Sequence, residues 1–162
     1  MTIVFDTNVL STFIKINRLD LLKIVFGKQE FLIPQSVYTE LSASKEYGSI
    51  FIGTVSKSGL FGKISLSKEE NELVIKLREY KILGEGEIEA LAVSKIRGVV
   101  LVTNDIKAKS VAESFGVKVV DLLDILRFCL KSRFTKYDIE KIIEEIETKD
   151  NIIIKNKELI FR

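Results

Sequence analysis

Carboxylates stand at several positions where a fold could bring them together. Three apolar stretches typical of buried strands each end in an aspartate, namely Asp6, Asp105 and Asp121. Three glutamates occupy the first turns of a predicted helix, namely Glu85, Glu87 and Glu89. Two carboxylates held ~4 Å apart repel each other by about 4 kcal/mol at an effective dielectric of ~20. A fold that gathers several of them without a fixed cation therefore favours a bound one. Mg²⁺ or Mn²⁺ suits such an all-oxygen site and supports in-line hydrolysis of phosphodiesters.

The composition narrows the available chemistry. The 162 residues include no histidine, which excludes Ser-His and Cys-His nucleophile systems, histidine general bases and histidine metal ligands. A single cysteine, Cys129, excludes an intramolecular disulfide and a multi-cysteine zinc site. The formal net charge of +2 comes from 25 basic and 23 acidic residues, so a nucleic-acid partner would require local clustering of charge. Catalysis must use carboxylates, lysines or hydroxyls.

Each acid also has a purely structural interpretation. The three aspartates could each cap the helix that follows, and capping is the favoured role of Asp121, because Asp124 stands three residues further on. Glu40 could lie on a solvated helix flank. The three glutamates of residues 85–89 could be present only because acids favour a helix N-terminus. A helical wheel places Glu87 on one border of the apolar stripe and its two neighbours on the other, so periodicity does not choose among them.

Apolar strands alternate with amphipathic helices along the chain, which predicts an α/β fold. The connections in such folds are right-handed crossovers, so the strands should form a parallel sheet whose carboxyl ends lie on one edge, where ligands bind. At 162 residues we expect a single domain over residues 1–162, a three-layer α/β/α sandwich around a mostly parallel sheet. The expected strands are Thr2–Phe5, Phe31–Ile33, Val99–Val102 and Val117–Val120, with Lys63–Leu66 as a weak edge strand.

Four short motifs together resemble the acidic signature of PIN-domain ribonucleases. They are Phe5-Asp6-Thr7-Asn8-Val9-Leu10, Tyr38-Thr39-Glu40-Leu41, Gly86-Glu87-Ile88-Glu89-Ala90-Leu91-Ala92 and Val102-Thr103-Asn104-Asp105. The Gly-Glu-x-Glu-Ala helix is similar to that of VapC-like toxins and related prokaryotic PIN-domain proteins. The intervals agree as well, with 34 residues from Asp6 to Glu40 and 18 from Glu87 to Asp105. The likeness covers roughly residues 1–130.

The resemblance implies a role for individual residues of this chain. The catalytic and metal-binding acids would be Asp6, Glu40, Glu87 and Asp105, with Mg²⁺ or Mn²⁺ as the cofactor. The groups that orient these acids and the attacking water would be Thr7, Asn8 and Thr103. Lys107 and Lys109 could contact phosphate, or could simply be solvated surface lysines.

The activity implied by the resemblance is metal-dependent endoribonuclease cleavage of RNA. The biological role would be that of a toxin restrained by an antitoxin protein, and a housekeeping RNA-processing nuclease is the alternative within the same chemistry. A PIN-like module that binds protein or RNA without turnover is a rival, against which the four intact acids argue. A receiver-like phosphoacceptor domain would need paired acids after its first strand. A haloacid-dehalogenase phosphatase would need a second aspartate where this chain has Asn8.

The C-terminal part lies outside the shared signature. It is expected to hold a helix over Thr135–Glu147 and a possible β-hairpin over Asn151–Phe161. The helix carries an isoleucine stripe, Ile139, Ile142, Ile143 and Ile146. Together with the apolar tail at Ile152–Ile154, it offers more apolar surface than a small core needs, although both could also pack onto their own domain. We therefore expect a homodimer in which this region contributes to an interface with a second copy or with an antitoxin. The role of Ser42–Gly62, rich in Ser, Gly and Lys, stays open.

The sequence carries no membrane or export signal that we recognise. No apolar run approaches the ~20 residues required to span a bilayer. The N-terminus lacks the basic and then apolar pattern of a signal peptide. We therefore expect a cytoplasmic protein without a membrane partner.

Overall fold

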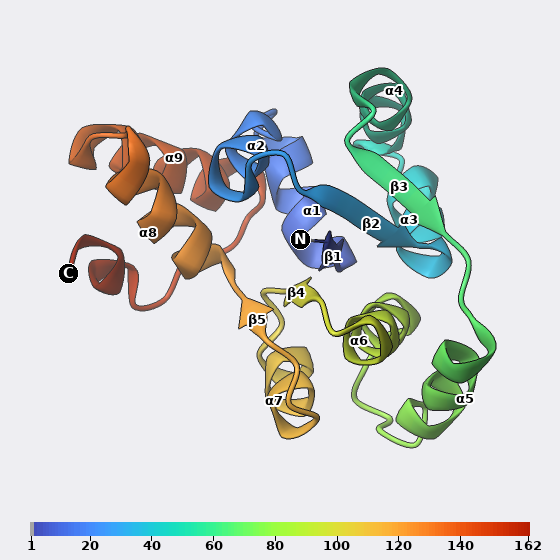
Figure 1. Cartoon of the computed structure of the whole chain (residues 1–162). Coiled ribbons are helices and arrows are strands. Elements are labelled where there is room, and N and C mark those ends of the chain that lie inside the picture. Colours follow the sequence, from blue (N-terminus) through green and yellow to red (C-terminus); the bar gives the residue numbers. More distant parts are fainter. Residues whose placement is uncertain (1) are drawn as a thin grey trace.

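The computed structural model describes residues 2–162, within which five parallel strands form one sheet between layers of helices (Figure 1). The strand order is β3-β2-β1-β4-β5, and every strand pair is parallel. The strands are β1 (Thr2–Phe5), β2 (Glu30–Pro34), β3 (Phe61–Ile64), β4 (Val100–Val102) and β5 (Val119–Val120). The predicted α/β/α sandwich is confirmed.

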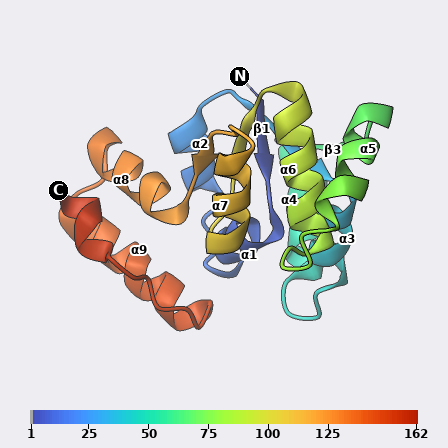
Figure 2. The same cartoon turned by 90° about the horizontal axis from the view of Figure 1, so that it is seen from below.

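Helices cover both faces of this sheet. One layer contains α1 (Thr7–Lys15), α2 (Asp20–Phe26), α8 (Leu122–Ser132) and α9 (Lys136–Lys149). The opposite layer contains α5 (Lys68–Leu77), α6 (Glu85–Arg97) and α7 (Ile106–Ser114). α3 (Gln35–Ala43) contacts both α6 and α4 (Gly48–Ser58), and a 3₁₀ helix, η1 (Lys157–Phe161), packs on α8. Seen from below, α8 and α9 lie at the end of the molecule away from α3 and α5 (Figure 2). No helix within residues 2–162 is both long enough and apolar enough to cross a bilayer.

Alternate side chains of the central strands pack into two separate cores. Ile3 and Phe5 of β1 belong to the core shared with α1, α2, α8 and α9, whereas Val4 belongs to the core shared with α5, α6 and α7. In β2, Phe31 belongs to the same core as Ile3, and Leu32 belongs to the same core as Val4. Each fully buried side chain of this size contributes about 1.5–3 kcal/mol. The central strands therefore have no polar face, as predicted for strands of a covered parallel sheet.

Local signals fix where the helices that surround the sheet begin and end. Asp121 caps α8 by accepting a hydrogen bond from the Asp124 amide at 3.0 Å, as predicted. Gly98 ends α6 with a φ of 64°, in the left-handed region that glycine adopts at low cost. The chain turns there and enters β4, so the end of that strand is placed beside the beginning of α6.

The region Ser42–Gly62 contains α4 and the approach to β3. Gly48, at the start of α4, packs against the preceding helix so closely that a Cβ would lie 2.4 Å from the Ser42 carbonyl oxygen. Phe51 is buried and explains part of the apolar character of this region, whereas Ile50 and Ile52 are exposed.

The C-terminal segment differs from the prediction, because no β-hairpin forms over residues 151–161. The segment makes a hydrogen bond to α9 instead of pairing its two halves as strands. The Ile154 amide donates to the Glu147 carboxylate at 3.1 Å. Asn156 then turns the chain with a φ of 55° into η1. Ile154 and Ile160 are both buried, so the two apolar runs anchor separately in the core.

The isoleucine stripe of α9 also lies elsewhere than expected. All four isoleucines, at positions 139, 142, 143 and 146, are at most 5% exposed and belong to the core shared with α1, α2 and α8. The stripe is therefore not available as an intermolecular surface. The homodimer expectation loses this part of its basis, whereas Ile153 of the apolar tail at residues 152–154 is 83% exposed; a homodimer stays a prediction.

Candidate active site

The four predicted acids gather at the carboxyl edge of the sheet. Asp6 directly follows β1 and Asp105 follows the neighbouring β4. Glu40 lies on α3, which follows β2, and Glu87 lies in the first turn of α6. Because the strands are parallel, their carboxyl ends and the helices that follow them share this edge, which is where ligands bind in open α/β sheets.

Asp6 is fully buried and is held by two hydrogen bonds. The Thr103 hydroxyl donates to one carboxylate oxygen, and the Val9 amide donates to the other at 3.1 Å. Asp6 therefore does cap α1, and it also belongs to the group of four acids. Burial raises the pKa of Asp6 to about 7; the two hydrogen bonds oppose this rise, and the charges of Glu87 and Asp105 add to it.

Glu40 is oriented by a contact with α1. The Thr7 hydroxyl donates a hydrogen bond to the Glu40 carboxylate at 2.5 Å. α6 approaches this pair so closely that a Cβ on Gly86 would lie 3.0 Å from the Thr7 hydroxyl and 3.2 Å from both Glu40 oxygens. The packing therefore favours glycine at this position, because a Cβ would force the Thr7 and Glu40 side chains to shift. Sequence reasoning gave Gly86 no role, although a glycine in the first turn of a helix, where it costs about 1 kcal/mol relative to alanine, was a usable signal.

The glutamates on either side of Glu87 have partners outside the group of four acids. Glu85 makes a bidentate ion pair with Arg78, at 2.9 and 3.2 Å, on the surface. Glu89 accepts a hydrogen bond from the Ser36 amide at 2.9 Å. α3 has no capping side chain of its own, so Glu89 supplies the missing cap from α6. The structure therefore separates three glutamates that helical periodicity left equivalent.

Glu87 points toward the other acids. Its Oε1 accepts a long hydrogen bond from the Asn8 side-chain amide, at 3.5 Å, and its other oxygen accepts one from the backbone amide that precedes α6, at 2.9 Å. Burial raises the pKa of Glu87, and the charges of Asp105 and Glu40 raise it further, whereas Lys107 lowers it. The hydrogen bond from Asn8 places the Glu87 carboxylate beside the start of α1, where Asn8 follows Asp6 and Thr7 in the chain.

Asp105 caps α7 and also belongs to the group of four acids. Its carboxylate accepts hydrogen bonds from the backbone amides of residues 107 and 108, both at 2.8 Å, at the start of α7. The Thr103 hydroxyl, which donates to Asp6, also accepts from the Asp105 amide at 3.1 Å. Thr103 thus connects the ends of β1 and β4. Of the two predicted phosphate contacts, Lys107 is exposed, whereas Lys109 is paired with Asp121 at 2.7 Å.

The charges of the four acids are not balanced by the protein. Within residues 2–162, none of these carboxylates lies within ion-pair distance of a lysine or arginine, although Asp6 is fully buried and Glu87 and Asp105 are partly buried; Glu40 is exposed. Three acids elsewhere with little-exposed side chains do form ion pairs. Those ion pairs are Glu70–Arg97 at 2.6 Å, Asp121–Lys109 at 2.7 Å and Asp150–Lys15 at 2.7 Å. Four unpaired carboxylates fit a hard divalent cation. The described residues contain no group of three acidic or other metal-binding side chains arranged as a preformed metal cage, so a cation would have to draw the carboxylates together.

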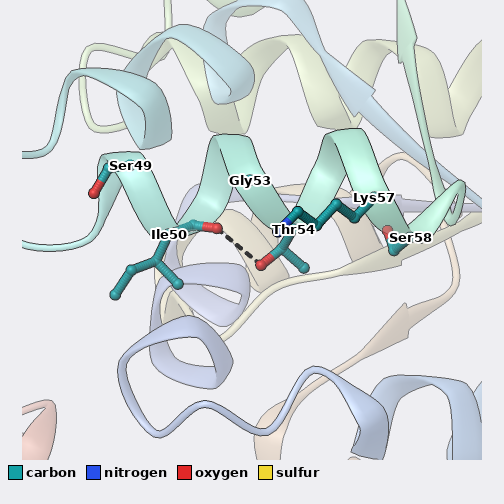
Figure 3. A pocket seen from close by; sticks show the side chains of 6 residues that line it. All are labelled: Ser49, Ile50, Gly53, Thr54, Lys57 and Ser58. Carbon is teal, nitrogen blue, oxygen red and sulfur yellow. Dashed lines mark hydrogen bonds between the residues drawn. The ribbon is translucent and has the colours of Figure 1, made fainter.

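A hollow elsewhere on the surface lacks the acidic side chains found at this edge of the sheet. It has a volume of about 500 Å³ and lies along the exposed face of α4 (Figure 3). Its lining residues are Ser49, Ile50, Gly53, Thr54, Lys57 and Ser58. The Thr54 hydroxyl is occupied by a hydrogen bond to the Ile50 carbonyl, at 2.8 Å. No carboxylate lines this hollow, and its single lysine is not opposed by a group that could act as its partner in catalysis.

Solved structures with a similar fold include toxin–antitoxin proteins. VapBC-1 from nontypeable Haemophilus influenzae aligns with a TM-score of 0.58 and 14% identity, over 75% of this chain and 98% of that chain. VapBC2 from Rickettsia felis, bound to a DNA fragment from its promoter, aligns with a TM-score of 0.54 and 19% identity, over 75% and 98%. A PilT N-terminus domain protein from Sulfolobus solfataricus aligns with a TM-score of 0.53 and 17% identity, over 83% and 98%. At these identities the likeness concerns the fold.

The family is established by a sequence model. A comparison with curated proteins finds no significant match. The family model DUF3368, described as a PIN domain, matches residues 2–159, which includes all four motifs and nearly the whole C-terminal part. The chain therefore belongs to the PIN-domain family.

Proposed function

We propose that the protein is a Mg²⁺- or Mn²⁺-dependent endoribonuclease that uses Asp6, Glu40, Glu87 and Asp105. The observation that carries this proposal is the position of four carboxylates at one edge of the sheet without an ion-paired lysine or arginine, among them the fully buried Asp6; the buried Glu70, by contrast, is paired with Arg97. Burial is the main cause of the raised pKa values of Asp6 and Glu87, and the charges of the neighbouring acids add to it. A bound divalent cation relieves the repulsion between these charges.

The residues of the chain prepare the site for such a cation. When bound, the metal supplies activation of water and stabilisation of charge at the phosphodiester. The Thr103 hydroxyl holds the Asp6 carboxylate, the Thr7 hydroxyl holds Glu40, and the amides at the start of α7 hold Asp105. These bonds orient the three carboxylates, and a bound cation would complete the arrangement by drawing them together. Because the pKa of Asp6 is about 7, cation binding must displace a proton at neutral pH.

We further propose that the cell uses this activity as the toxin of a toxin–antitoxin pair. This step rests on the family and on the fold shared with VapBC proteins. A housekeeping RNA-processing nuclease would use the same site. A binding module without turnover has no need of four unbalanced acids, whose mutual repulsion would only destabilise the fold.

Analysis of RNA cleavage products tests the proposed chemistry. The purified protein is incubated with a single-stranded RNA in Mn²⁺ and, separately, in EDTA. We expect internal cleavage in Mn²⁺ only, with 5′-phosphate and 3′-hydroxyl ends, because the 3′-oxygen is the leaving group. Cleavage that persists in EDTA, or products with cyclic phosphate ends, would contradict a metal-dependent hydrolysis. The toxin role is tested separately. Expression of this protein should arrest growth, and co-expression of a small protein encoded by a neighbouring gene should restore it.

A further inference from the structure

A hollow of about 590 Å³ adjoins the acidic edge of the sheet. Its first wall is formed by residues 103–105 at the end of β4, so the hollow shares Asp105 with the group of four acids. The other walls come from α7, from the start of α8 and from the C-terminal segment 152–156, which Figure 1 shows near α8. Pockets that bind small ligands have volumes of about 300–1,000 Å³. The hollow is therefore large enough for a ligand that begins at the acids and continues beyond them.

Apolar side chains stand over a charged floor in this hollow. Ile106 of α7 and Ile153 of the C-terminal segment are 77% and 83% exposed, and Leu123 is half-buried beside them. The floor contains the ion pair between Lys109 and Asp121, at 2.7 Å. Two isoleucines this exposed are costly to leave in water, and both line the same hollow.

Five polar side chains of the lining have no partner among the described residues, namely Glu113, Asn156 and three that suit the parts of a nucleotide. Asn104 and Ser110 make no side-chain hydrogen bond, and Lys155 makes no ion pair, within residues 2–162. All three are exposed. An amide and a hydroxyl can read the edge of a base or a ribose hydroxyl, and a lysine can meet a phosphate. The lining thus offers one group for each part of a nucleotide.

We propose that this hollow binds the nucleotide next to the scissile phosphodiester of the RNA substrate. The proposal rests on the proposed endoribonuclease function. The hollow begins at Thr103–Asp105, so a strand whose phosphate lies at the acids has room there for the neighbouring nucleotide. The base packs against Ile106 and Ile153, and Lys155 meets the next phosphate. An apolar peptide is disfavoured, because it would leave the unpartnered amide, hydroxyl and lysine of the lining without a use.

Kinetics of surface variants test this subsite. Ile153→Ser removes the exposed apolar wall without touching the core. Ile75→Ser is the matched control, since Ile75 is 63% exposed on α5, outside the hollow. With single-stranded RNA in Mn²⁺, we expect Ile153→Ser to raise KM by about five-fold or more with little change in kcat. The control should retain both parameters.

Abasic substrates identify the part of the RNA that occupies the hollow. We place one abasic nucleotide at successive positions around the cleaved bond. With the parent protein, an abasic nucleotide at one position adjacent to that bond should raise KM about as much as Ile153→Ser does with intact RNA. In Ile153→Ser the same abasic substitution should add no further loss, because the base and the isoleucine make one contact.

The outcomes distinguish the subsite from the proposed function. If the parent cleaves RNA and Ile153→Ser has the same KM as the control, the subsite is wrong and the nuclease function survives. If Ile153→Ser leaves RNA kinetics unchanged but weakens binding of a co-expressed antitoxin, the hollow belongs to a peptide partner and the nucleotide proposal is overturned. A parent protein that cleaves no RNA would refute both proposals together.

Discussion

Asp6→Asn should stabilise the protein when no divalent cation is present. The Asp6 carboxylate is fully buried without a cationic partner, and its pKa rises from an ordinary value of 3.8 to about 7. At about 1.4 kcal/mol for each pH unit, keeping this group ionised in the folded protein costs about 4 kcal/mol. Asparagine keeps the shape, can accept from the Val9 amide and can donate to the Thr103 hydroxyl, so most of the gain should survive.

The pH dependence of this effect follows from the direction of the shift. Below pH 3.8 both the folded and the unfolded chain carry a protonated Asp6, and parent and variant should be about equally stable. Between about pH 4 and pH 7 the unfolded chain loses the proton while the folded chain keeps it, so the parent loses stability as the pH rises. Above about pH 7 the difference should reach its full size.

Thermal unfolding in EDTA measures the difference directly. At pH 8 we expect the variant to melt roughly 5–10 °C above the parent, since ~1 kcal/mol corresponds to about 2–4 °C in a chain of this size. At pH 4 the two melting temperatures should converge. Mn²⁺ should then stabilise the parent and not the variant, through binding to the folded state. A variant that melts below the parent at pH 8 in EDTA would refute the reasoning, because it would show that the Asp6 charge supports the fold.

Three further results are expected. Gly86→Ala should lower kcat by about ten-fold or more, because the new methyl group stands 3.2 Å from both Glu40 oxygens and misplaces that acid; unchanged cleavage in a folded variant would show that Glu40 can move freely. Glu89→Ala should cost about 1 kcal/mol in thermal unfolding, the usual loss for a helix cap, and should lower activity by loosening α3, whereas Glu89→Gln still accepts from the Ser36 amide and should retain most activity; loss of activity in the glutamine variant would instead make Glu89 a metal ligand. The affinity for Mn²⁺, measured by calorimetry, should rise from pH 6 to pH 8, because Asp6, whose pKa is raised to about 7, releases its proton on binding; an affinity that does not depend on pH would contradict the raised value.

The sheet and the position of two acids could be predicted from the sequence alone. Uninterrupted apolar runs such as Val99–Val102 identify strands covered on both faces, and parallel strands present their carboxyl ends on one edge. The aspartates that end β1 and β4 therefore had to lie near each other. Glu40 and Glu87 are different. They were selected only by the resemblance to PIN-domain ribonucleases, because each lies on a helix whose rotation the sequence does not fix.

The difference between Glu87 and its neighbours depends on tertiary contacts. Glu85 is occupied by Arg78, which lies in an irregular turn between α5 and α6. Glu89 is occupied by the start of α3, 53 residues away in the chain. No local periodicity encodes either partner. The same limit applies to Gly86, whose need for a small side chain arises from the approach of another helix.

Both errors in the C-terminal part have one physical cause. An apolar pattern shows which residues avoid water, but it does not show what covers them. The isoleucines of α9 pack inside their own molecule. The two apolar runs of residues 151–161 fit a hairpin equally well, yet Ile154 and Ile160 are buried one by one and the Ile154 amide finds Glu147. The positive φ of Asn156 is compatible with either arrangement.

The rate of RNA cleavage in a matched pair of variants tests the central claim most directly. Glu87→Gln and Glu85→Gln make the same chemical change two residues apart on one helix. With single-stranded RNA in Mn²⁺, we predict that Glu87→Gln abolishes cleavage, whereas Glu85→Gln, which loses only a surface ion pair worth roughly 0–1 kcal/mol, retains most of it. Equal losses in the two variants, or full activity in Glu87→Gln, would contradict a catalytic group made of Asp6, Glu40, Glu87 and Asp105.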